Sequence, residues 1–303
     1  MKDNYGRPVT SLRISITDRC NLNCFYCHNE GCRNADREME TGEISDLIEI
    51  ATDFGIRKVK FTGGEPLIRK DILEILESIS DFKLDDVSIT TNGIGLNDLA
   101  EDLYEAGLDR VNVSLDTLNP RKYEEITGKP KLREVKKGIE SAVETGLTPV
   151  KLNTILISGF NENEVEDLID FAMDTGSVLQ LIELEEVLPE NKEMYRKYHK
   201  DLDNIEKKIE KRAVDVETRW LMQVRRKYIL KNGGEVEIVN PMHNSEFCSH
   251  CTRLRITADG YLKPCLMRND NLVDVLTPLR KDGVKEVRRA YEEAVRRREP
   301  FYK

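Results

Sequence analysis

Three cysteines stand close together early in the chain, in the stretch CNLNCFYC. Cys20, Cys24 and Cys27 are separated by three and two residues. In a reducing compartment, clustered cysteines bind metal more often than they form disulfides. A structural zinc site takes four protein ligands, for which His28 or Cys32 is a further candidate. An iron–sulfur cluster held by three thiolates instead leaves one iron open to a small molecule, and the spacing favours this interpretation.

A second set of three cysteines lies near the other end of the chain, in FCSHCTRLRITADGYLKPCL. Two residues separate Cys248 from Cys251, and thirteen more precede Cys265. Three thiolates again leave an iron open, whereas His243 or His250 would complete a zinc site. The spacing by itself leaves zinc and iron–sulfur equally open.

Two arginines in the same stretch bear on that choice. Arg253 and Arg255 flank one residue, so in a strand their side chains share a face. Arginine suits the bidentate recognition of phosphate. A phosphate-binding face beside the cysteines favours an iron–sulfur centre that handles a substrate.

The bulk properties of the chain limit the kind of protein it can be. Its 303 residues suffice for one large domain or two ordinary ones, and 39% apolar residues provide a sizeable core. A net charge of −9 argues against general nucleic-acid binding, which favours a basic face. The sequence shows no apolar run of roughly 18 residues, as a membrane span needs, and no secretory signal. We therefore expect a soluble cytoplasmic protein that binds neither nucleic acid nor membrane.

Strand and helix patterns alternate from residue 12 to about residue 185. Six runs are typical of strands: 12–17, 57–62, 86–91, 110–115, 149–156 and 178–184. Apolar residues recur at helical spacing between them, for example at Ile44, Leu47 and Ile48. Successive βα units predict a parallel sheet with helices outside, and six are too few for a closed eight-stranded barrel. We predict an α/β fold, a partial (β/α)6 barrel of TIM type.

We expect the barrel to occupy residues 1–186 and a C-terminal extension of strands and helices, carrying the second cysteine set, to occupy 187–303. An apolar stripe along the charged segment 190–212 predicts one amphipathic surface helix. Residues 219–265 predict short strands, with a hairpin at 258–260. The tail from 283 to 298 is typical of a charged helix.

Alternation along the strands separates apolar from charged side chains. In the first strand Leu12 and Ile14 face one side and Arg13 the other. Helices must cover the apolar side, which leaves a polar set for the barrel interior. That set contains four cations: Arg13, Lys58, Lys60 and Lys151. Burial of unpaired cations is costly, so they imply an anionic ligand, unless they reach the barrel rim or pair with Asp and Glu.

The first cysteine set and its surroundings resemble the signature of radical S-adenosylmethionine (SAM) enzymes. The resemblance lies in CxxxCxxC with Tyr26 before the last cysteine, and in GGEP at 63–66 after the second strand. The longer pattern resembles one family among them, the GTP 3′,8-cyclases of molybdenum cofactor biosynthesis. It runs through LRISITDRCNLNCFYC, KFTGGEPLIRKD, TTNG, RVNVSLD, VKLN and FCSHCTRLRITADGYLKPCL, over most of residues 5–270.

This resemblance implies two [4Fe–4S] clusters, SAM and the substrate GTP. The implied cluster ligands are Cys20, Cys24 and Cys27 for the first and Cys248, Cys251 and Cys265 for the second. The implied SAM-binding residues are Tyr26, Gly64, Ser114 and Glu185. The implied GTP-binding residues are Arg13, Lys60, Thr91, Lys151, Arg253, Leu254 and Arg255. No side chain is implied as catalytic, because the radical of the cofactor carries the chemistry.

The resemblance also implies a reaction. A 5′-deoxyadenosyl radical from SAM takes the hydrogen from C3′ of the GTP ribose, and C3′ then attacks C8 of guanine. The product is (8S)-3′,8-cyclo-7,8-dihydroguanosine 5′-triphosphate. The implied partners are a one-electron reductant protein and a cyclic pyranopterin monophosphate synthase downstream. We also consider a homodimer.

Other functions stay open at this point. One alternative is a different radical SAM enzyme with an auxiliary cluster, such as one that modifies a peptide. The RLR run between the auxiliary cysteines argues against this alternative. A non-catalytic iron–sulfur carrier or zinc-ribbon binding protein is the second alternative. Two positions depart from the family pattern, because Gln180 stands where Arg is frequent and Glu185 where Met is frequent.

Overall fold

The computed structural model describes residues 1–31, 37–187, 189–281 and 283–303. All six predicted strands are present: β1 (Ser11–Ser15), β2 (Lys58–Thr62), β3 (Asp86–Thr91), β4 (Arg110–Ser114), β5 (Lys151–Leu156) and β6 (Val178–Glu183). The helices between them are α1 (Thr41–Asp53), α2 (Ile72–Glu77), α3 (Leu96–Glu105), α4 (Pro120–Thr127), α5 (Leu132–Thr145) and α6 (Val165–Asp174). Short 3-10 turns lie at η1 (Asn29–Gly31) and η2 (Pro66–Ile68). The βα alternation is therefore confirmed.

The chain after β6 contributes further helices and strands. Its helical elements are η3 (Pro189–Asn191), α7 (Lys192–Tyr198), α8 (Asp203–Glu210), η4 (Trp220–Met222), α9 (Ser245–Ser249), α10 (Leu276–Lys281) and α11 (Val284–Arg296). Its strands are β7 (Ala213–Arg219), β8 (Arg225–Leu230), β9 (Glu235–Val239), β10 (Arg253–Ile256), β11 (Tyr261–Lys263) and β12 (Val273–Asp274). The predicted hairpin joins β10 to β11, and the predicted tail helix is α11.

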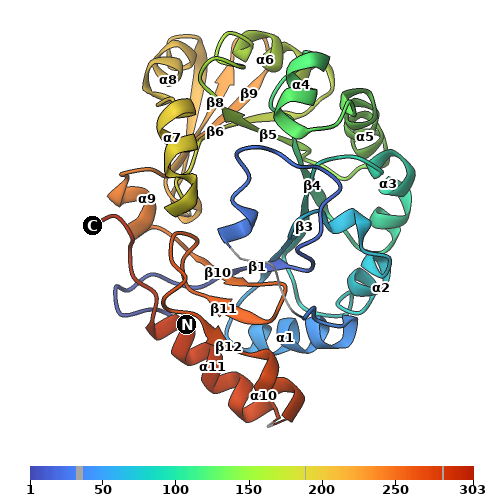
Figure 1. Cartoon of the computed structure of the whole chain (residues 1–303), viewed down its shortest axis with the longest axis vertical. Coiled ribbons are helices and arrows are strands. Elements are labelled where there is room, and N and C mark those ends of the chain that lie inside the picture. The colour runs from blue at the N-terminus through green and yellow to red at the C-terminus, as the bar shows by residue number, and fades with distance from the viewer. Residues whose placement is uncertain (32–36, 188, 282) are drawn as a thin grey trace.

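The described strands form one sheet in the order β12-β11-β10-β1-β2-β3-β4-β5-β6-β9-β8-β7. Figure 1 shows the strands curving around a central space, with α1 to α6 outside them. Strand β10 pairs in parallel with β1, and β9 pairs in parallel with β6. The C-terminal part therefore adds one parallel strand to each edge of the six-stranded set. The partial barrel is confirmed, but the predicted six strands are not the whole of its wall.

Apolar side chains on the outer face of the sheet pack against the helices, as the alternation predicts. Leu12, Ile14 and Ile16 are fully buried in the main apolar core. The other face holds the polar set described below. Each buried apolar side chain on the outer face stabilises the fold by roughly 2 kcal/mol. The fold therefore does not depend on an apolar interior, and the polar interior is available for a ligand.

The segment 190–212 differs from the prediction of one helix. It forms α7 and α8, separated by an extended turn at His199. His199 Nε2 lies 2.7 Å from Glu183 Oε1 at the end of β6, and Ser158 N donates to Tyr198 O at 2.9 Å. These two tethers stop α7, and Leu202 then enters the core with α8. A stripe of apolar residues cannot reveal such a break, because both helices keep the same spacing.

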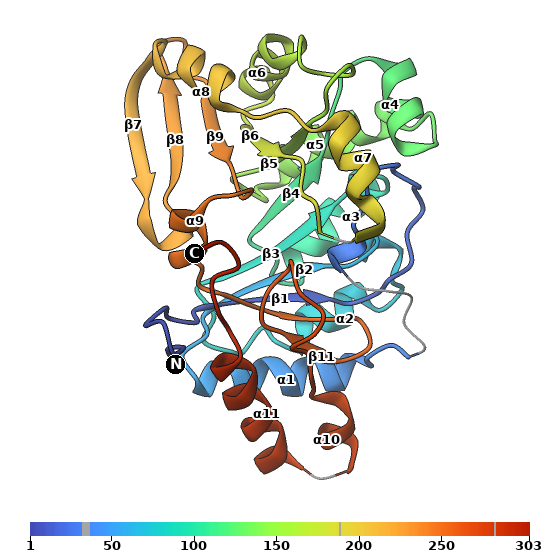
Figure 2. The ribbon, with the colours of Figure 1, turned by 60° about the vertical axis from the view of Figure 1, so that its left-hand side comes forward.

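The C-terminal helices α10 and α11 lie beneath α1, as Figures 1 and 2 show. Tyr291 on α11 is buried and donates to Leu47 O on α1 at 2.8 Å.

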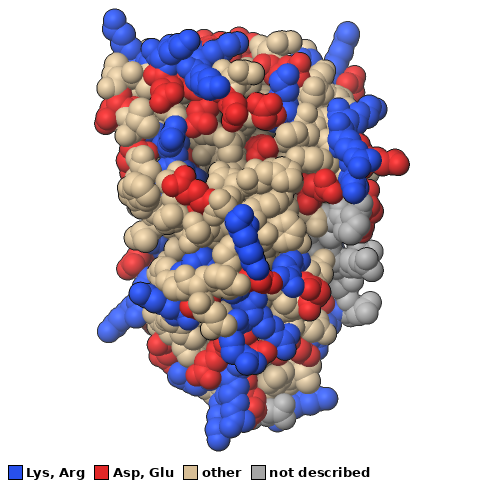
Figure 3. All heavy atoms as spheres, turned by 90° about the vertical axis from the view of Figure 1, so that its left-hand side faces the viewer, with Lys and Arg blue, Asp and Glu red and all other residues tan. Residues whose placement is uncertain are grey.

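In Figure 2 the strands β7, β8 and β9 stand together at one side of the sheet. Figure 3 shows acidic and basic side chains interspersed on one face of the molecule. Among the described residues, no helix is both long enough and apolar enough to cross a membrane.

Candidate functional site

The two cysteine sets lie at opposite ends of two paired strands. Strand β1 runs directly into the loop that carries Cys20 to Cys27, and Cys251 precedes β10 by two residues. Because β1 and β10 are parallel, the first set lies at their C-terminal end and the second at their N-terminal end. Strand β11 runs antiparallel to β10 and ends at Lys263, so Cys265 returns to the same end as Cys251. Thirteen intervening residues therefore form a hairpin that brings two ligands together.

The first cysteine loop rests on α4 and on aromatic rings. Asn23 N donates to Thr127 O at 2.9 Å, and Phe25 N donates to Ile126 O at 3.1 Å. Helix α4 is itself well defined, because the side chain of Asn119 caps its first turn.

Phe25 anchors the loop on the other side. Its ring lies 5.4 Å from the ring of Phe160 and 4.9 Å from that of Tyr198. In Figure 1 the loop after β1 lies within the ring of strands. The loop that carries the cysteines is thus held in place by contacts that do not involve the sulfur atoms.

The donor atoms of the first set fit a cluster held by thiolates. Leu22 N donates to Cys20 Sγ and Asn29 N donates to Cys27 Sγ, both at 3.4 Å. Such N–H···S bonds are among the contacts by which a protein tunes an iron–sulfur cluster. Burial raises the pKa of Cys24, so a metal centre is needed to hold it as a thiolate at neutral pH.

A single metal ion fits this arrangement less well than a cluster. In the described part of the chain, no three His, Cys, Asp or Glu side chains are grouped to hold one ion. A four-iron cluster makes no such demand, because each thiolate binds a different iron. His28 lies instead 3.6 Å from Glu185, and Cys32 falls outside the described residues.

Buried cations surround the second cysteine set. Arg7 donates to Cys248 O at 2.8 Å, and Arg298 donates to Cys251 O at 2.6 Å. Both arginines pair with the buried Asp3. Burial would raise the pKa of Cys251, but Arg253, Arg298 and Arg7 outweigh burial and lower it. No local pattern indicates this support, because residues 3 and 7 are far along the chain from residue 298.

Three predicted cations form a row across the interior face. Arg13 on β1 is the register partner of Arg255 on β10 and of Lys60 on β2. Glu30 accepts from Arg13 at 3.4 Å and from Arg255 at 2.6 Å. Burial would raise the pKa of Glu30, but these two arginines hold it at about 2. Strand pairing therefore places the three cations side by side, and the carboxylate of Glu30 partly neutralises their charge.

Lys60 of this row and one further cation, Arg253, have shifted pKa values. Lys60 donates to Asn112 Oδ1 at 2.9 Å, and its pKa is lowered by burial and by Arg110 and Arg13. Arg253 also has a lowered pKa, because of burial and the nearby Arg225 and Arg13. Because these buried cations repel one another, an anion bound among them would be stabilised.

Three predictions need correction or refinement. Lys58 was expected in the interior, but it is exposed, since it starts β2 at the rim. Leu254 is fully buried in the apolar core, so only its backbone can reach a ligand. Thr91 is also buried and donates to Glu65 Oε1 at 2.6 Å, which commits its hydroxyl to a protein partner.

The residues implied in SAM binding follow four different strands at the same end of the sheet. Tyr26 follows β1, Gly64 follows β2, Ser114 ends β4 and Glu185 follows β6. Tyr26 Oη donates to Asp116 at 2.5 Å. Active sites of parallel βα barrels lie at this end, so the structure brings these residues to one rim.

The GGEP turn is pressed against the backbone that leads to the first cysteines. A Cβ on Gly64 would lie 2.1 Å from Arg19 O, and one on Gly63 would lie 2.2 Å from Thr17 O. Gly64 N donates to Thr17 O at 2.8 Å, and Glu65 N donates to Arg19 O at 2.8 Å. The two glycines are thus required to join the β2 turn to the cysteine loop, whatever ligand lies nearby.

Sequence reasoning missed a group of charges on the last strands. Arg219, Arg225 and Glu237 reach the interior from β7, β8 and β9, and Glu237 also pairs with the predicted Lys151. Burial lowers the pKa of Lys151 to about 8, although Glu237 acts in the opposite direction. The charges Arg225-Arg226-Lys227 gave no indication of which side chain points inward.

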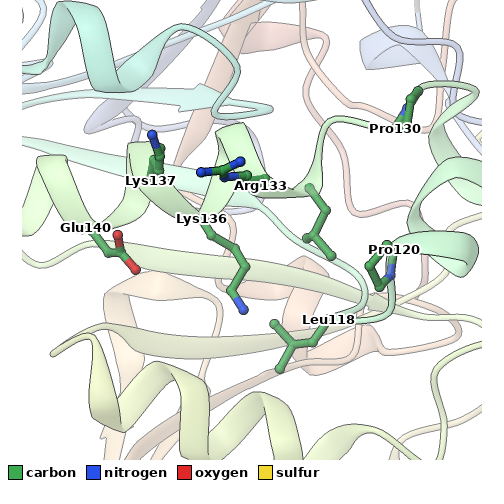
Figure 4. Close-up of a pocket in the computed structure, with 8 residues that line it drawn as sticks. Leu118, Pro120, Pro130, Arg133, Lys136, Lys137 and Glu140 are labelled. Atoms are coloured by element: carbon green, nitrogen blue, oxygen red, sulfur yellow. The ribbon is translucent and has the colours of Figure 1, made fainter.

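A separate hollow of about 400 Å³ lies between α4 and α5, outside the strands. Figure 4 shows Arg133, Lys136 and Lys137 above a floor that includes Leu118 and Pro120. It contains none of the predicted site residues and is therefore not part of the candidate site.

Two family models match the chain. The Radical SAM superfamily model matches residues 14–172, and the Molybdenum Cofactor Synthesis C model matches residues 177–303. Among curated proteins, the "Probable GTP 3′,8-cyclase" of Methanothermobacter thermautotrophicus is 49% identical over 302 residues, covering 100% of this chain and 99% of that protein. The protein of the same name from Methanocaldococcus jannaschii is 51% identical over 304 residues, with coverage of 100% and 99%.

Solved structures share the fold. Streptococcus suis SuiB bound to precursor peptide SuiA has a TM-score of 0.64 at 19% identity, covering 86% of this chain and 60% of SuiB. A tagged anSMEcpe with bound AdoMet has a TM-score of 0.62 at 18% identity, covering 87% of this chain and 76% of that one. At these identities the likeness concerns the fold alone.

Proposed function

The chain belongs to the radical SAM superfamily, and from this premise we propose that it is a GTP 3′,8-cyclase of molybdenum cofactor biosynthesis. In the proposed reaction the hydrogen on C3′ of the GTP ribose is transferred to a 5′-deoxyadenosyl radical. C3′ then joins C8 of guanine, and one electron and one proton taken up by the cyclised radical give (8S)-3′,8-cyclo-7,8-dihydroguanosine 5′-triphosphate, an isomer of GTP.

The observation that carries the proposal is the position of Arg13 and Arg255 between the two cysteine sets. The paired strands β1 and β10 carry one set at each end and these arginines between them. Five residues of strand span about 16 Å. A substrate bound along this ladder would have one cysteine set at each end and cations beside it.

The first set, Cys20, Cys24 and Cys27, would hold a [4Fe–4S] cluster that, with SAM and one electron, supplies the 5′-deoxyadenosyl radical. Tyr26, Gly64, Ser114 and Glu185 would bind SAM from the rim that they share. Phe25, packed on Phe160 and Tyr198, would close the loop against water.

The second set, Cys248, Cys251 and Cys265, would hold a second [4Fe–4S] cluster, with an open iron toward guanine. Support comes from the hairpin that joins Cys251 to Cys265 and from the cations that lower the pKa of Cys251. Arg253 begins β10 two residues from Cys251, so it would orient the base at this end.

The interior cations would bind the rest of GTP. Arg13, Arg255 and Lys60 share a row, and Lys151 lies on β5 of the same sheet. Leu254 would contribute its backbone alone. Thr91 would contribute only after its hydroxyl leaves Glu65, so we propose that it mainly holds Glu65 in place.

A reductant and a downstream enzyme belong to the same proposal. The chemistry requires a protein that delivers single electrons, and its product requires a cyclic pyranopterin monophosphate synthase. Clustered cysteines favour the reducing cytoplasm as the location. A homodimer stays a prediction that solution scattering can test.

An anaerobic reaction tests the proposed function. Reconstituted protein is incubated with GTP, SAM and dithionite, and mass spectrometry should show a product isomeric with GTP together with 5′-deoxyadenosine. Cys24→Ala should abolish both. SAM cleavage without any change in GTP would favour a different radical SAM enzyme. Absence of SAM cleavage, in protein carrying about eight irons per chain, would favour an electron carrier.

A further inference from the structure

One buried carboxylate is shared by three cations at the far side of the sheet. Glu237 on β9 is fully buried and pairs with Lys151, with Arg219 at 3.1 Å and with Arg225 at 3.3 Å. The side chains of Lys151 and Arg225 are 8% and 10% exposed. These groups come from β5, β7, β8 and β9, so four strands of one side of the sheet converge on one carboxylate.

The charges of this group do not balance. Three cations and one carboxylate leave two positive charges in excess. Arg219 also reaches the exposed Glu217, at 4.0 Å, but that carboxylate lies 3.1 Å from Lys227. Among the described residues, Glu237 is the one buried carboxylate that pairs with these cations. Arg219 is 28% exposed, but Lys151 and Arg225 are nearly buried and share their one carboxylate with it. Unbalanced charge in such a site is costly, so the excess points to an anion that the group receives.

Arg225 also connects this group to the row of cations. It contributes to the lowered pKa of Arg253 and of Arg13, which places it near both side chains. Its Nη2 donates to Gln223 at 2.9 Å, but its buried Nε has no partner in the described structure. This N–H group of a nearly buried guanidinium can therefore donate a hydrogen bond to an oxygen of a bound ligand.

We propose that Arg225 and Arg219 bind the polyphosphate of the nucleotide substrate, with Glu237 as the residue that positions them and Lys151. The inference rests on the proposed function for the identity of the nucleotide, but it concerns only the phosphate end. A guanidinium fork matches phosphate oxygens, and several charged oxygens are needed to neutralise this group. Glu237 keeps the cations apart and oriented until the phosphates arrive.

The test compares Arg225→Met with Arg226→Met. Arg226 is the next residue on β8, its side chain is 53% exposed, and it lies 3.9 Å from Glu206 on the outside. Methionine retains most of the aliphatic stem in both variants. Dissociation constants for GTP, GMP and guanosine are measured by calorimetry on cluster-loaded protein.

The polyphosphate contact predicts a selective loss. Arg225→Met should bind GTP about 10- to 100-fold more weakly, as expected for loss of a charged hydrogen bond, and bind guanosine within about twofold of wild type. Arg226→Met should match wild type for both ligands. Equal loss for GTP and guanosine, or no loss for either, would overturn the inference.

The stability of the ligand-free protein separates binding from a structural role. Removing one of three crowded cations leaves Glu237 paired with Lys151 and Arg219, so the melting temperature of Arg225→Met should not fall. A marked fall would mean that Arg225 serves the fold. Inorganic tripolyphosphate should raise the melting temperature of wild type more than that of Arg225→Met. Wild-type protein that binds ATP as well as GTP would contradict the proposed function while leaving the polyphosphate inference intact.

Discussion

Arg13 and Arg255 lie side by side on the parallel strands β1 and β10, and Glu30 accepts hydrogen bonds from both. Two cations from opposite ends of the sequence thus meet on the same face through strand pairing. Their shared carboxylate occupies the position that an anionic ligand would take. Binding of a nucleotide at this pair therefore has to displace Glu30 or include it.

Substitution of Glu30 separates its support of the two arginines from its competition with a ligand. In Glu30→Gln the two arginines lose their anionic partner, so the free energy of unfolding should fall by about 1–3 kcal/mol. GTP should bind more tightly, because no carboxylate then competes for the arginines. Denaturant unfolding and calorimetry measure the two effects. Weaker GTP binding in this variant would show that Glu30 contacts the substrate directly.

Arg253→Ala should separate the two halves of the reaction. Arg253 lies beside the second cysteine set and away from the rim that carries the SAM residues. Product formation from GTP should fall by about 100-fold, as for loss of a buried charged contact, while some uncoupled SAM cleavage survives. The exposed Arg121 offers a control, since Arg121→Ala should leave both activities unchanged. Equal loss of product and 5′-deoxyadenosine in iron-loaded Arg253→Ala would contradict this division.

GTP affinity should depend on pH through Lys151. Burial lowers the pKa of Lys151 to about 8, so the side chain is charged below that pH and becomes neutral above it. The affinity for GTP should therefore fall as pH rises from 7 to 9, by at most about tenfold per pH unit for this group. Arginine keeps its charge throughout, so Lys151→Arg should show a smaller slope. Identical slopes in the two proteins would exclude Lys151 as the titrating group.

Gly64→Ala should damage the fold more than its small size suggests. The added Cβ would meet Arg19 O at 2.1 Å and Asp18 O at 2.7 Å, and these backbone atoms cannot rotate away. We expect the free energy of unfolding to fall by about 1–3 kcal/mol or more, with loss of iron from the first cysteine set.

Gly42 in α1 provides the matched control for that substitution. A Cβ there meets nothing within 4 Å, so Gly42→Ala should be neutral or stabilising by up to about 1 kcal/mol. Denaturant unfolding and iron analysis of both variants measure the difference. Similar stability of the two alanine variants would show that the turn can move away from the cysteine loop.

The barrel and most of its interior cations could be predicted from the sequence, because strand alternation is local. Arg13, Lys60 and Lys151 follow from the position of each residue within its own strand. Lys58 obeys the same alternation but stands at a strand end, where the interior opens to water. The alternation of side chains along a strand cannot distinguish a residue at the barrel rim from one in the barrel interior.

The last strands could not be placed in the same way. Strands β9 and β10 flank the six predicted strands on opposite sides, and no pattern within either strand specifies its neighbour. Arg225 and Glu237 therefore meet Lys151 only through tertiary pairing. The supporting contacts of the second cysteine set, from Arg7 and Arg298, depend on chain ends that meet in space.

The fate of one hydrogen atom tests the central claim most directly. GTP carrying deuterium at C3′ is incubated anaerobically with the cluster-loaded protein, SAM and reductant, and the 5′-deoxyadenosine is analysed by mass spectrometry. A chamber that holds GTP between the two cysteine sets predicts deuterium in 5′-deoxyadenosine and its loss from C3′ in the product. Unlabelled 5′-deoxyadenosine, formed while the deuterium stays on GTP, would contradict the account.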